Sequence, residues 1–190
     1  MISRIDHIAI AVKDYNKAYN FFSTLLGAIP GSHSTDENMK YLWQNLYLGD
    51  LSRLELLAAS GSGSFLDGFL SKKEGGVHHI TLQTPDIKKT AGFLDRNGIP
   101  YFGYHEYGPV WKELFIHPKH AFGVLIQIAE FNADDWIAPS VRMPQGKKFE
   151  IKPEEGGCTI LFSHPGGGRV AISLNRAEMM ELKNKLNESL

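Results

Sequence analysis

The chain has a single cysteine and almost no net charge, and each of these features argues against one class of protein. Cys158 is the only cysteine among 190 residues, so no internal disulfide can form, which is the usual state in a reducing cytosol. It lies in an apolar stretch typical of a strand interior, and we expect a buried structural thiol there. The formal net charge of −1 argues against a nucleic-acid partner.

Long apolar runs are also missing. No apolar stretch reaches the ~18 residues that a membrane-spanning helix needs. Residues 2–7 do not combine a basic segment with an apolar run, so we expect no signal peptide. The hydrophobic share of 43% and the charged share of 22% are those of an ordinary globular protein. We therefore expect a cytoplasmic protein that acts on a small molecule and does not contact a membrane.

An internal repeat organises the first two thirds of the chain. His79 follows His7 by 72 positions, and Gln127 follows Glu55 by the same interval. A register kept over this length is the signature of two copies of one structural unit. The predicted modules are residues 3–59 and 76–131, inside a domain of residues 1–131.

Each module has the pattern of a strand, a helix and further strands. Residues 4–12 and 76–84 are rich in Ile, Val and Ala, which is typical of buried strands. Asp14 and Asp86 stand where they can cap the helices that follow, and a glycine comes after each helix. Further strands are expected near residues 40–48, 52–58, 101–104, 111–116 and 122–130. The sequence thus predicts an α+β fold in which two βαβββ modules form a curved mixed sheet around a metal site.

The rest of the chain does not repeat. Residues 61–76 have the glycine and serine content of a flexible linker. Residues 132–190 are predicted to be a C-terminal extension with a β-hairpin, whose turn is at 164–168, and a helix from Arg176 to about Glu188 that Asn175 caps. The apolar side of this helix and the strand edges need covering, so we expect packing on the modules or a homodimer.

Four polar side chains occupy equivalent places in otherwise apolar strands. His7 and His79 lie on the first strands of the two modules, and Glu55 and Gln127 lie on the last strands. A lone histidine in such a strand is more often a hydrogen-bonded core residue, but polar positions that recur in both modules are costly to bury without a shared purpose. A pseudo-twofold axis would bring all four together. Two imidazoles, a carboxylate and an amide oxygen suit a divalent ion such as Zn, Ni, Co, Mn or Fe.

Three stretches of the chain resemble a known superfamily. They are Ile-Asp-His-Ile-Ala at 5–9, Gly-Val-His-His-Ile at 76–80, and Ile-His-Pro-Lys at 116–119 leading into Gly-Val-Leu-Ile-Gln at 123–127. The chain resembles the vicinal oxygen chelate superfamily of glyoxalases, bleomycin-resistance proteins and extradiol dioxygenases, and within it the methylmalonyl-CoA epimerases. The resemblance covers residues 3–131. It implies a metal bound by His7, Glu55, His79 and Gln127, and a supporting role for His78 on the opposite face of its strand.

The chain departs from the epimerase pattern at two of these positions. Epimerases of this type usually carry Gln at the position of Glu55 and Glu at the position of Gln127, and here the two are exchanged. A Gln amide cannot accept a proton from a carbon acid. The family's second base comes from the third strand of the first module, where the nearby Gln44 is not a base either. Glu55 is therefore the leading candidate for a catalytic base, and Glu113 is a weaker one.

Three classes of function are compatible with these residues. The first is a metal-dependent isomerase, epimerase or lyase that moves a proton next to the carbonyl of a small 2-oxo compound or acyl thioester, like methylmalonyl-CoA epimerase or glyoxalase I. The second is an iron-dependent dioxygenase, since two His and one Glu form a facial triad. The third is a non-catalytic small-molecule-binding protein. A pocket in any of these could be lined by Trp43, Tyr101, Tyr104, Tyr107 and Trp111.

Overall fold

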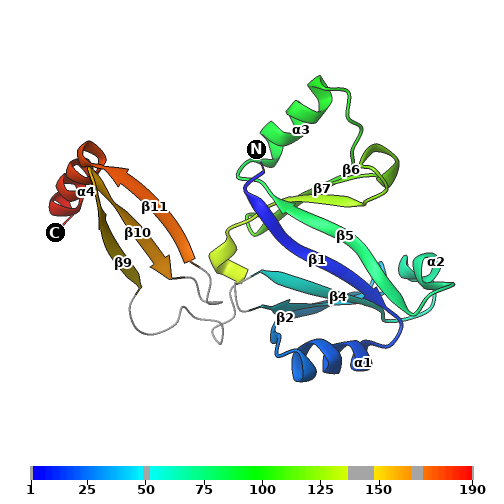
Figure 1. The fold of residues 1–190 in the computed structure, drawn as a ribbon. Helices are drawn as coiled ribbons and strands as arrows, with labels where there is room; N and C mark the ends of the chain where they lie inside the picture. Colours follow the sequence, from blue (N-terminus) through cyan, green and yellow to red (C-terminus); the bar gives the residue numbers. More distant parts are fainter. Residues whose placement is uncertain (1, 49–51, 137–147, 164–168, 190) are drawn as a thin grey trace. The chain divides into compact units, whose positions relative to one another are not determined.

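A computed structural model describes residues 2–48, 52–136, 148–163 and 169–189 of the chain. The chain divides into two compact units, Met1–Val141 and Arg142–Leu190 (Figure 1). The first unit therefore extends beyond the last predicted strand, and the domain boundary at residue 131 stays a prediction.

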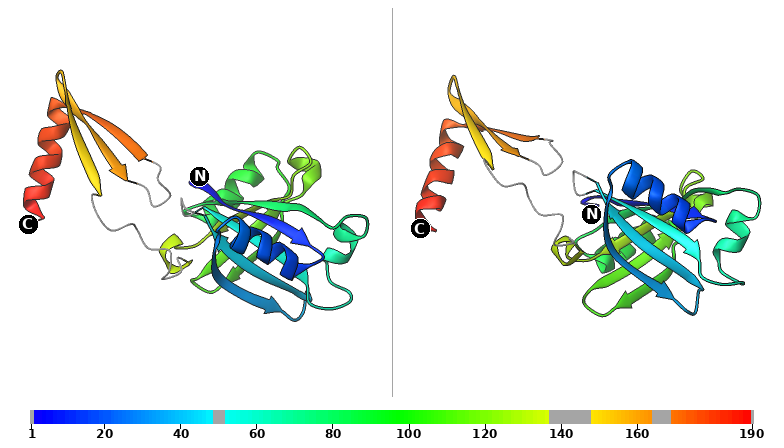
Figure 2. Two further views of the ribbon diagram at one scale, coloured as in Figure 1. Left: turned by 60° about the horizontal axis from the view of Figure 1, so that its bottom comes forward. Right: turned by 90° about the horizontal axis from the view of Figure 1, so that it is seen from below.

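An eight-stranded sheet forms the first unit, in the order β2-β3-β4-β1-β5-β8-β7-β6. The antiparallel pair β1 and β5 lies in the middle, and in each module the first and last strands pair in parallel. The sheet is strongly curved (Figure 2), and the predicted α+β fold of two βαβββ modules is confirmed. The strands are β1 (Arg4–Val12), β2 (Ile29–Asp36), β3 (Tyr41–Tyr47), β4 (Arg53–Ala59), β5 (Gly75–Gln83), β6 (Phe102–Tyr107), β7 (Trp111–Ile116) and β8 (Ile126–Glu130).

The predicted helices begin at their capping aspartates. The Asp14 carboxylate accepts a hydrogen bond from the Lys17 backbone N–H, and Asp86 does the same for Lys89. The second helix, α3 (Ile87–Arg96), is regular, whereas the first changes from α1 (Tyr15–Tyr19) into the π-helical segment η1 (Asn20–Leu25). Short helical turns follow at η2 (Pro118–His120) and η3 (Ala133–Trp136).

Besides the short turns η2 and η3, one strand and one α-helix of the first unit were not predicted. Strand β2 contains Pro30 and Gly31, has no fully buried residue and forms one edge of the sheet, so it lacks the apolar alternation that marks a half-buried strand. Helix α2 (Leu66–Leu70) lies in the segment predicted to be a flexible linker, and that prediction is wrong. Leu66 and Leu70 are buried against Ala9, Ala11 and Leu57, so burial orders this segment despite its glycines.

The packing of β1 decides which side chains are available for a site. Ile10 packs against the same buried cluster, Ala28, Leu46 and Leu56, as Tyr15 and Ala18 of the first helix. Because side chains alternate in a strand, His7 and Ala9 lie on the face away from this helix. Both are buried there.

The second unit is a three-stranded antiparallel sheet with one helix, α4 (Arg176–Glu188). Asn175 caps this helix as predicted and forms a capping box with Glu178. Cys158 is buried, also as predicted, while the predicted turn at 164–168 lies outside the described residues. No helix in the described ranges is long and apolar enough to span a membrane. The strands are β9 (Phe149–Glu154), β10 (Gly157–Ser163) and β11 (Arg169–Asn175).

Candidate metal centre and cavity

Two bulges in the central strand pair position the two histidines. Asp6 is an extra residue in β1, and His78 is an extra residue in β5, at equivalent places in the repeat. Each lies beside the histidine that follows it: Asp6 Oδ2 is 2.8 Å from His7 Nδ1, and His78 Nδ1 is 3.0 Å from His79 Nδ1. The prediction that His78 points to the opposite face is therefore wrong, because strict alternation fails at a bulge.

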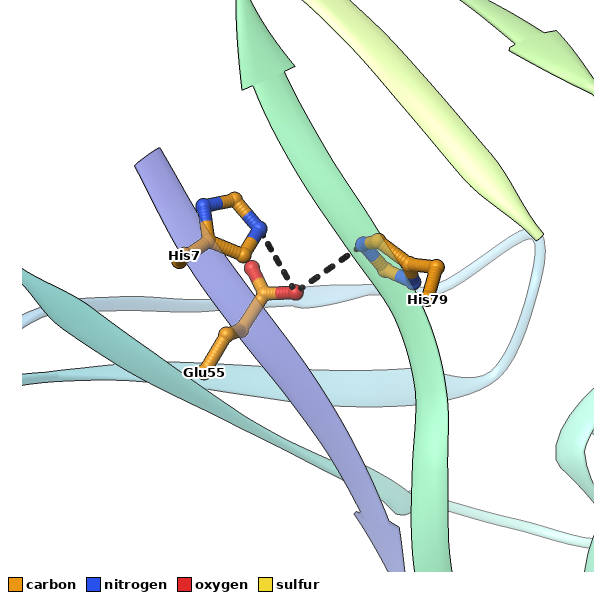
Figure 3. A group of neighbouring side chains, drawn as sticks. All are labelled: His7, Glu55 and His79. Atoms are coloured by element: carbon orange, nitrogen blue, oxygen red, sulfur yellow. Dashed lines mark ion pairs between the residues drawn. The ribbon is translucent and has the colours of Figure 1, made fainter. Parts of the chain in front are cut away.

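The remaining ring nitrogens of both histidines face Glu55 (Figure 3). Glu55 Oε2 is 3.5 Å from His7 Nε2 and 3.7 Å from His79 Nε2. The donor atoms of the three side chains lie within 4.8 Å of one another. The structure thus brings together three of the four predicted ligands, from β1, β4 and β5.

Gln127 is connected to this cluster through Thr81. Thr81 Oγ1 is 2.8 Å from His7 Nε2 and donates a hydrogen bond to Gln127 Oε1 at 2.5 Å. Gln127 Nε2 in turn donates to Glu113 Oε2 at 2.6 Å. Sequence reasoning missed Thr81, although its position two residues after His79 in the same strand places both on one face.

Opposing effects set the charge states in the cluster. Burial alone would raise the pKa of Glu55, but the imidazoles of His7 and His79 outweigh it and hold that pKa below its usual range. Burial would lower the pKa of His7, but the Glu55 and Asp6 carboxylates outweigh it and raise that pKa. Burial lowers the pKa of His79 to about 3, so this imidazole is neutral. An ionised carboxylate and a neutral imidazole are the forms that bind metal ions.

One buried atom of the cluster is evidence that the site binds a metal ion. His79 Nε2 has no hydrogen-bond partner within the described part of the chain. A buried polar atom without a partner is costly, and an ion between the two histidines and Glu55 would satisfy it. Two nitrogen donors and one oxygen donor also match the N/O shells that bind zinc or iron. The residues present therefore fit a divalent metal ion, with Gln127 as the further predicted ligand.

Asp6 fixes the orientation of His7. It forms a buried ion pair with Arg53, and Arg4 Nη2 lies 2.8 Å from its other oxygen. Burial would raise the pKa of Asp6, but the hydrogen bond from His7 and the charge of Arg53 lower it. The hydrogen bond between His7 Nδ1 and Asp6 fixes His7 Nε2 toward Glu55, where its lone pair becomes available to a metal ion once Nε2 has lost its proton.

Replacing Arg53 by methionine should destabilise the fold, because the Asp6 carboxylate would stay buried without its buried cationic partner. We expect a loss of about 3–5 kcal/mol in the free energy of unfolding, measured by urea denaturation. Lys13→Met, which breaks the exposed pair of Lys13 with Glu74, is the matched control and should cost about 0–1 kcal/mol. Equal losses in the two variants would contradict a structural role for the buried pair.

A cavity of about 260 Å³ opens next to the cluster. Its lining includes His7, Glu55, Glu113 and Gln127 together with five aromatic side chains. The cavity therefore combines acidic and metal-ligating groups with aromatic side chains, a combination typical of a small-molecule site.

Glu113 is the second buried carboxylate of this cavity. It accepts hydrogen bonds from Trp111 Nε1 at 2.8 Å and from Gln127 Nε2 at 2.6 Å. Burial raises its pKa, and the charge of Glu55 adds to that rise. Glu113 therefore lies in the cavity but outside the three-residue cluster.

Some of the other candidates from the sequence fall outside the cavity, and others line it. Gln44 is buried on the opposite side of β3, where its amide donates to the backbone carbonyls of Gly31 and Asn45. The neighbouring Asn45, which the sequence did not single out, lines the cavity instead. Tyr101 packs with the hydrophobic cluster beneath α3. The other aromatic candidates, Trp43, Tyr107 and Trp111, do line the cavity, while Tyr104 does not.

Two features define the class of fold and site. Two βαβββ modules pair along their first strands, and two histidines and a glutamate lie close together on these modules. Residues 6–115 match the family described as the Glyoxalase/Bleomycin resistance protein/Dioxygenase superfamily. The chain belongs to this superfamily, as the sequence resemblance indicated.

The similar proteins within this superfamily include epimerases. The ethylmalonyl-CoA/methylmalonyl-CoA epimerase of Cereibacter sphaeroides is 34% identical over 140 residues, which cover 68% of this chain and 99% of that protein. The crystal structure of methylmalonyl-CoA epimerase from Mycobacterium tuberculosis is 25% identical, with a TM-score of 0.63 over 69% of this chain and 89% of that one. A methylmalonyl-CoA epimerase solved with methylmalonyl-CoA and NH4+ is 26% identical, with a TM-score of 0.63 over 70% of this chain and 97% of that one.

Proposed function

We propose that the chain is a divalent-metal-dependent enzyme that moves a proton on the carbon next to the carbonyl of an acyl thioester or small 2-oxo compound. The observation that carries the proposal is the buried cluster of His7, Glu55 and His79 beside a cavity with a second carboxylate, Glu113. The similar proteins are named as epimerases of acyl-CoA compounds, which favours the thioester and an epimerase-like reaction.

The residues of the site divide between holding the metal and moving the proton. His7, Glu55, His79 and Gln127 would hold the ion, which supplies positive charge for the carbonyl oxygen as charge develops there. Glu55 lies between two imidazoles and suits the role of ligand. We infer that Glu113, rather than the Glu55 that the sequence favoured, accepts the proton from carbon, because it lines the cavity from the other module and lies outside the metal cluster. An epimerase removes a proton from one face of a carbon and returns one to the other face, so Glu55 would act as the second acid–base group in addition to binding the metal.

Proton exchange with solvent tests the proposal. Metal-loaded protein in heavy water should incorporate deuterium at the α-carbon of methylmalonyl-CoA, as followed by mass spectrometry. Removing the metal with EDTA should abolish incorporation, and adding it back should restore it. A fully metal-loaded protein that exchanges no α-proton in a panel of acyl thioesters and 2-oxo acids would refute this function.

An iron-dependent dioxygenase is the second candidate, because two histidines and one carboxylate are also the ligand set of non-haem iron oxygenases. Oxygen consumption by the Fe(II)-loaded protein with a catechol would favour it. The homodimer remains a prediction from the sequence.

A further inference from the structure

One side of the three-stranded sheet in the second unit is apolar throughout. Residues that pair directly across an antiparallel sheet lie on the same side of it. The register of β10 with its two neighbours therefore places three rows of apolar partners on one side, and none of their members carries a charge. This surface, the apolar face, consists of Phe149, Ile151 and Pro153 of β9, Cys158, Ile160 and Phe162 of β10, and Val170, Ile172 and Leu174 of β11.

Helix α4 covers only one end of the apolar face. It begins directly after β11, at the end of the sheet where Cys158 lies, and it contacts β10 and β11. Cys158 and Ile160 are the only buried residues in the described part of this unit. Toward the other end, five large side chains of the face stay 41–53% exposed, namely Phe149, Ile151, Phe162, Val170 and Ile172.

So small a core requires a further cover. Units below roughly 70 residues rarely bury enough apolar surface to be stable by themselves, and this one spans only Arg142–Leu190. It also has no disulfide to compensate, because Cys158 is the only cysteine of the chain. The apolar face is therefore expected to be covered permanently rather than in a passing encounter.

The exposed part of the face is large enough for an interface between two copies. Five side chains of this size, each about half exposed, present roughly 400–500 Å² of surface. Two copies packed face to face would bury about twice that area, which is close to the ~1,000 Å² at which specific interfaces begin. Leu186 of α4, also exposed, can add to it.

The absence of charge allows the face to pack against itself. In a twofold interface a patch meets the same patch of the other copy, so charged groups would meet groups of their own sign. The charged residues of β9, Glu150, Lys152 and Glu154, alternate with the apolar ones and lie on the other side of the sheet. A second copy of the chain is also present wherever the face is present.

The first unit does not need the second unit to complete its fold. The family match lies inside the first unit, and the similar epimerase of Cereibacter sphaeroides is matched over nearly its whole length by a part of this chain. That relative therefore has the fold of the first unit without a counterpart of the whole second unit. This observation favours a second copy over the first unit as the cover.

We propose that the apolar face is a homodimer interface, in which the second units of two copies pack face to face across a twofold axis. Phe149, Phe162 and Val170, the row farthest from the start of α4, lie in the contact. The inference assigns the homodimer expected from the sequence to a definite surface. It stands apart from the proposed function, because no residue of the face belongs to the metal cluster or lines the cavity.

Photo-cross-linking of the full chain tests the interface. Phe149 is replaced by p-benzoylphenylalanine, a photoreactive residue that keeps a phenyl ring, and the purified metal-loaded protein is irradiated. We expect a product of twice the chain mass on a denaturing gel. Mass spectrometry should place the cross-link within residues 148–189 of the second copy. Light scattering at micromolar concentration should show that the unmodified chain is not a monomer.

Two glutamate substitutions at neighbouring positions of β11 form a matched pair. Ile172→Glu adds a carboxylate to the apolar face and should lower the yield of the doubled product at least about tenfold, because two like charges would meet in the interface. Ala171→Glu adds the same charge on the other side of the strand and should leave the yield unchanged. Circular dichroism checks that both variants fold, and Val170→Glu takes the place of Ile172→Glu if that variant does not.

Three results would overturn the inference. The first is a cross-link from position 149 to any residue of 2–136, which would mean that a first unit covers the face. The second is a monomer in solution without a cross-link to another copy. The third is an equal yield of the doubled product in the folded Ile172→Glu and Ala171→Glu variants. Metal content and α-proton exchange should stay at the wild-type level in both variants, so failure of the proposed function would leave this test unaffected.

Discussion

Replacing His79 by alanine is expected to lower the affinity of the chain for a divalent metal ion by more than about 100-fold. Removing residues that only orient a ligand already costs about 10–100-fold, so removing the ligand itself should cost more. His79 Nε2 is a buried atom for which the described residues offer no hydrogen-bond partner, and it faces Glu55. His7→Ala should have a comparable effect. Competition with a chromogenic chelator measures the affinity, and elemental analysis measures the metal content.

His78→Ala is the matched control for this experiment. His78 neighbours His79 in sequence and contacts its Nδ1, but it does not belong to the three-residue cluster. Its loss should therefore stay within the range of about 10–100-fold that is typical of orienting residues. A larger loss for His78→Ala than for His79→Ala would mean that the two histidines have exchanged roles and that the cluster is not the metal site.

The repeat allowed much of this arrangement to be predicted from the sequence. His7, Glu55 and His79 could be assigned to one point because equivalent positions of two modules meet across a pseudo-twofold axis. The limits of the prediction lie where the chain departs from regular alternation. The bulges at Asp6 and His78 insert one residue each, and nothing in the local residue pattern marks them.

Other features depend on tertiary contacts that no local pattern reveals. Strand β2 is held by pairing with β3, and α2 by burial of its two leucines. Trp136 lies outside the repeat, and its place in the cavity follows from contacts with Trp43 and Trp111. These are long-range interactions, which override local propensity.

The presence of glutamate at position 55 and glutamine at position 127 has a structural counterpart. Gln127 donates its amide N–H to Glu113 at 2.6 Å, and its carbonyl oxygen accepts from Thr81. A glutamate at position 127 would place two carboxylates side by side in a buried site, where one of them would have to be protonated. The amide thus keeps Gln127 compatible with a metal-ligand role while Glu113 stays available on the adjacent strand.

Because of this arrangement, a conservative substitution of Glu113 should abolish proton transfer and leave metal binding intact. Glu113→Gln preserves size and can still accept hydrogen bonds from Trp111 and Gln127, but it cannot take a proton from carbon. We expect α-proton exchange to fall by about 10²–10⁴-fold, the usual contribution of a positioned base. Metal content, measured on the same preparation, should remain within about tenfold of wild type, since Glu113 would not be a ligand.

Comparison with Glu55→Gln assigns the two carboxylates. Because Glu55 lies between both histidines, its replacement should lower the metal affinity and the exchange rate together, and excess metal should restore part of the exchange. Glu106→Gln is the control and should change neither the metal affinity nor the exchange rate. Glu106 lies on the neighbouring strand β6, and its exposed carboxylate pairs with Lys88. If Glu113→Gln exchanges protons at the wild-type rate while Glu55→Gln binds metal fully and is inactive, Glu55 is the base. In that case Glu113 orients Gln127 and takes no part in proton transfer.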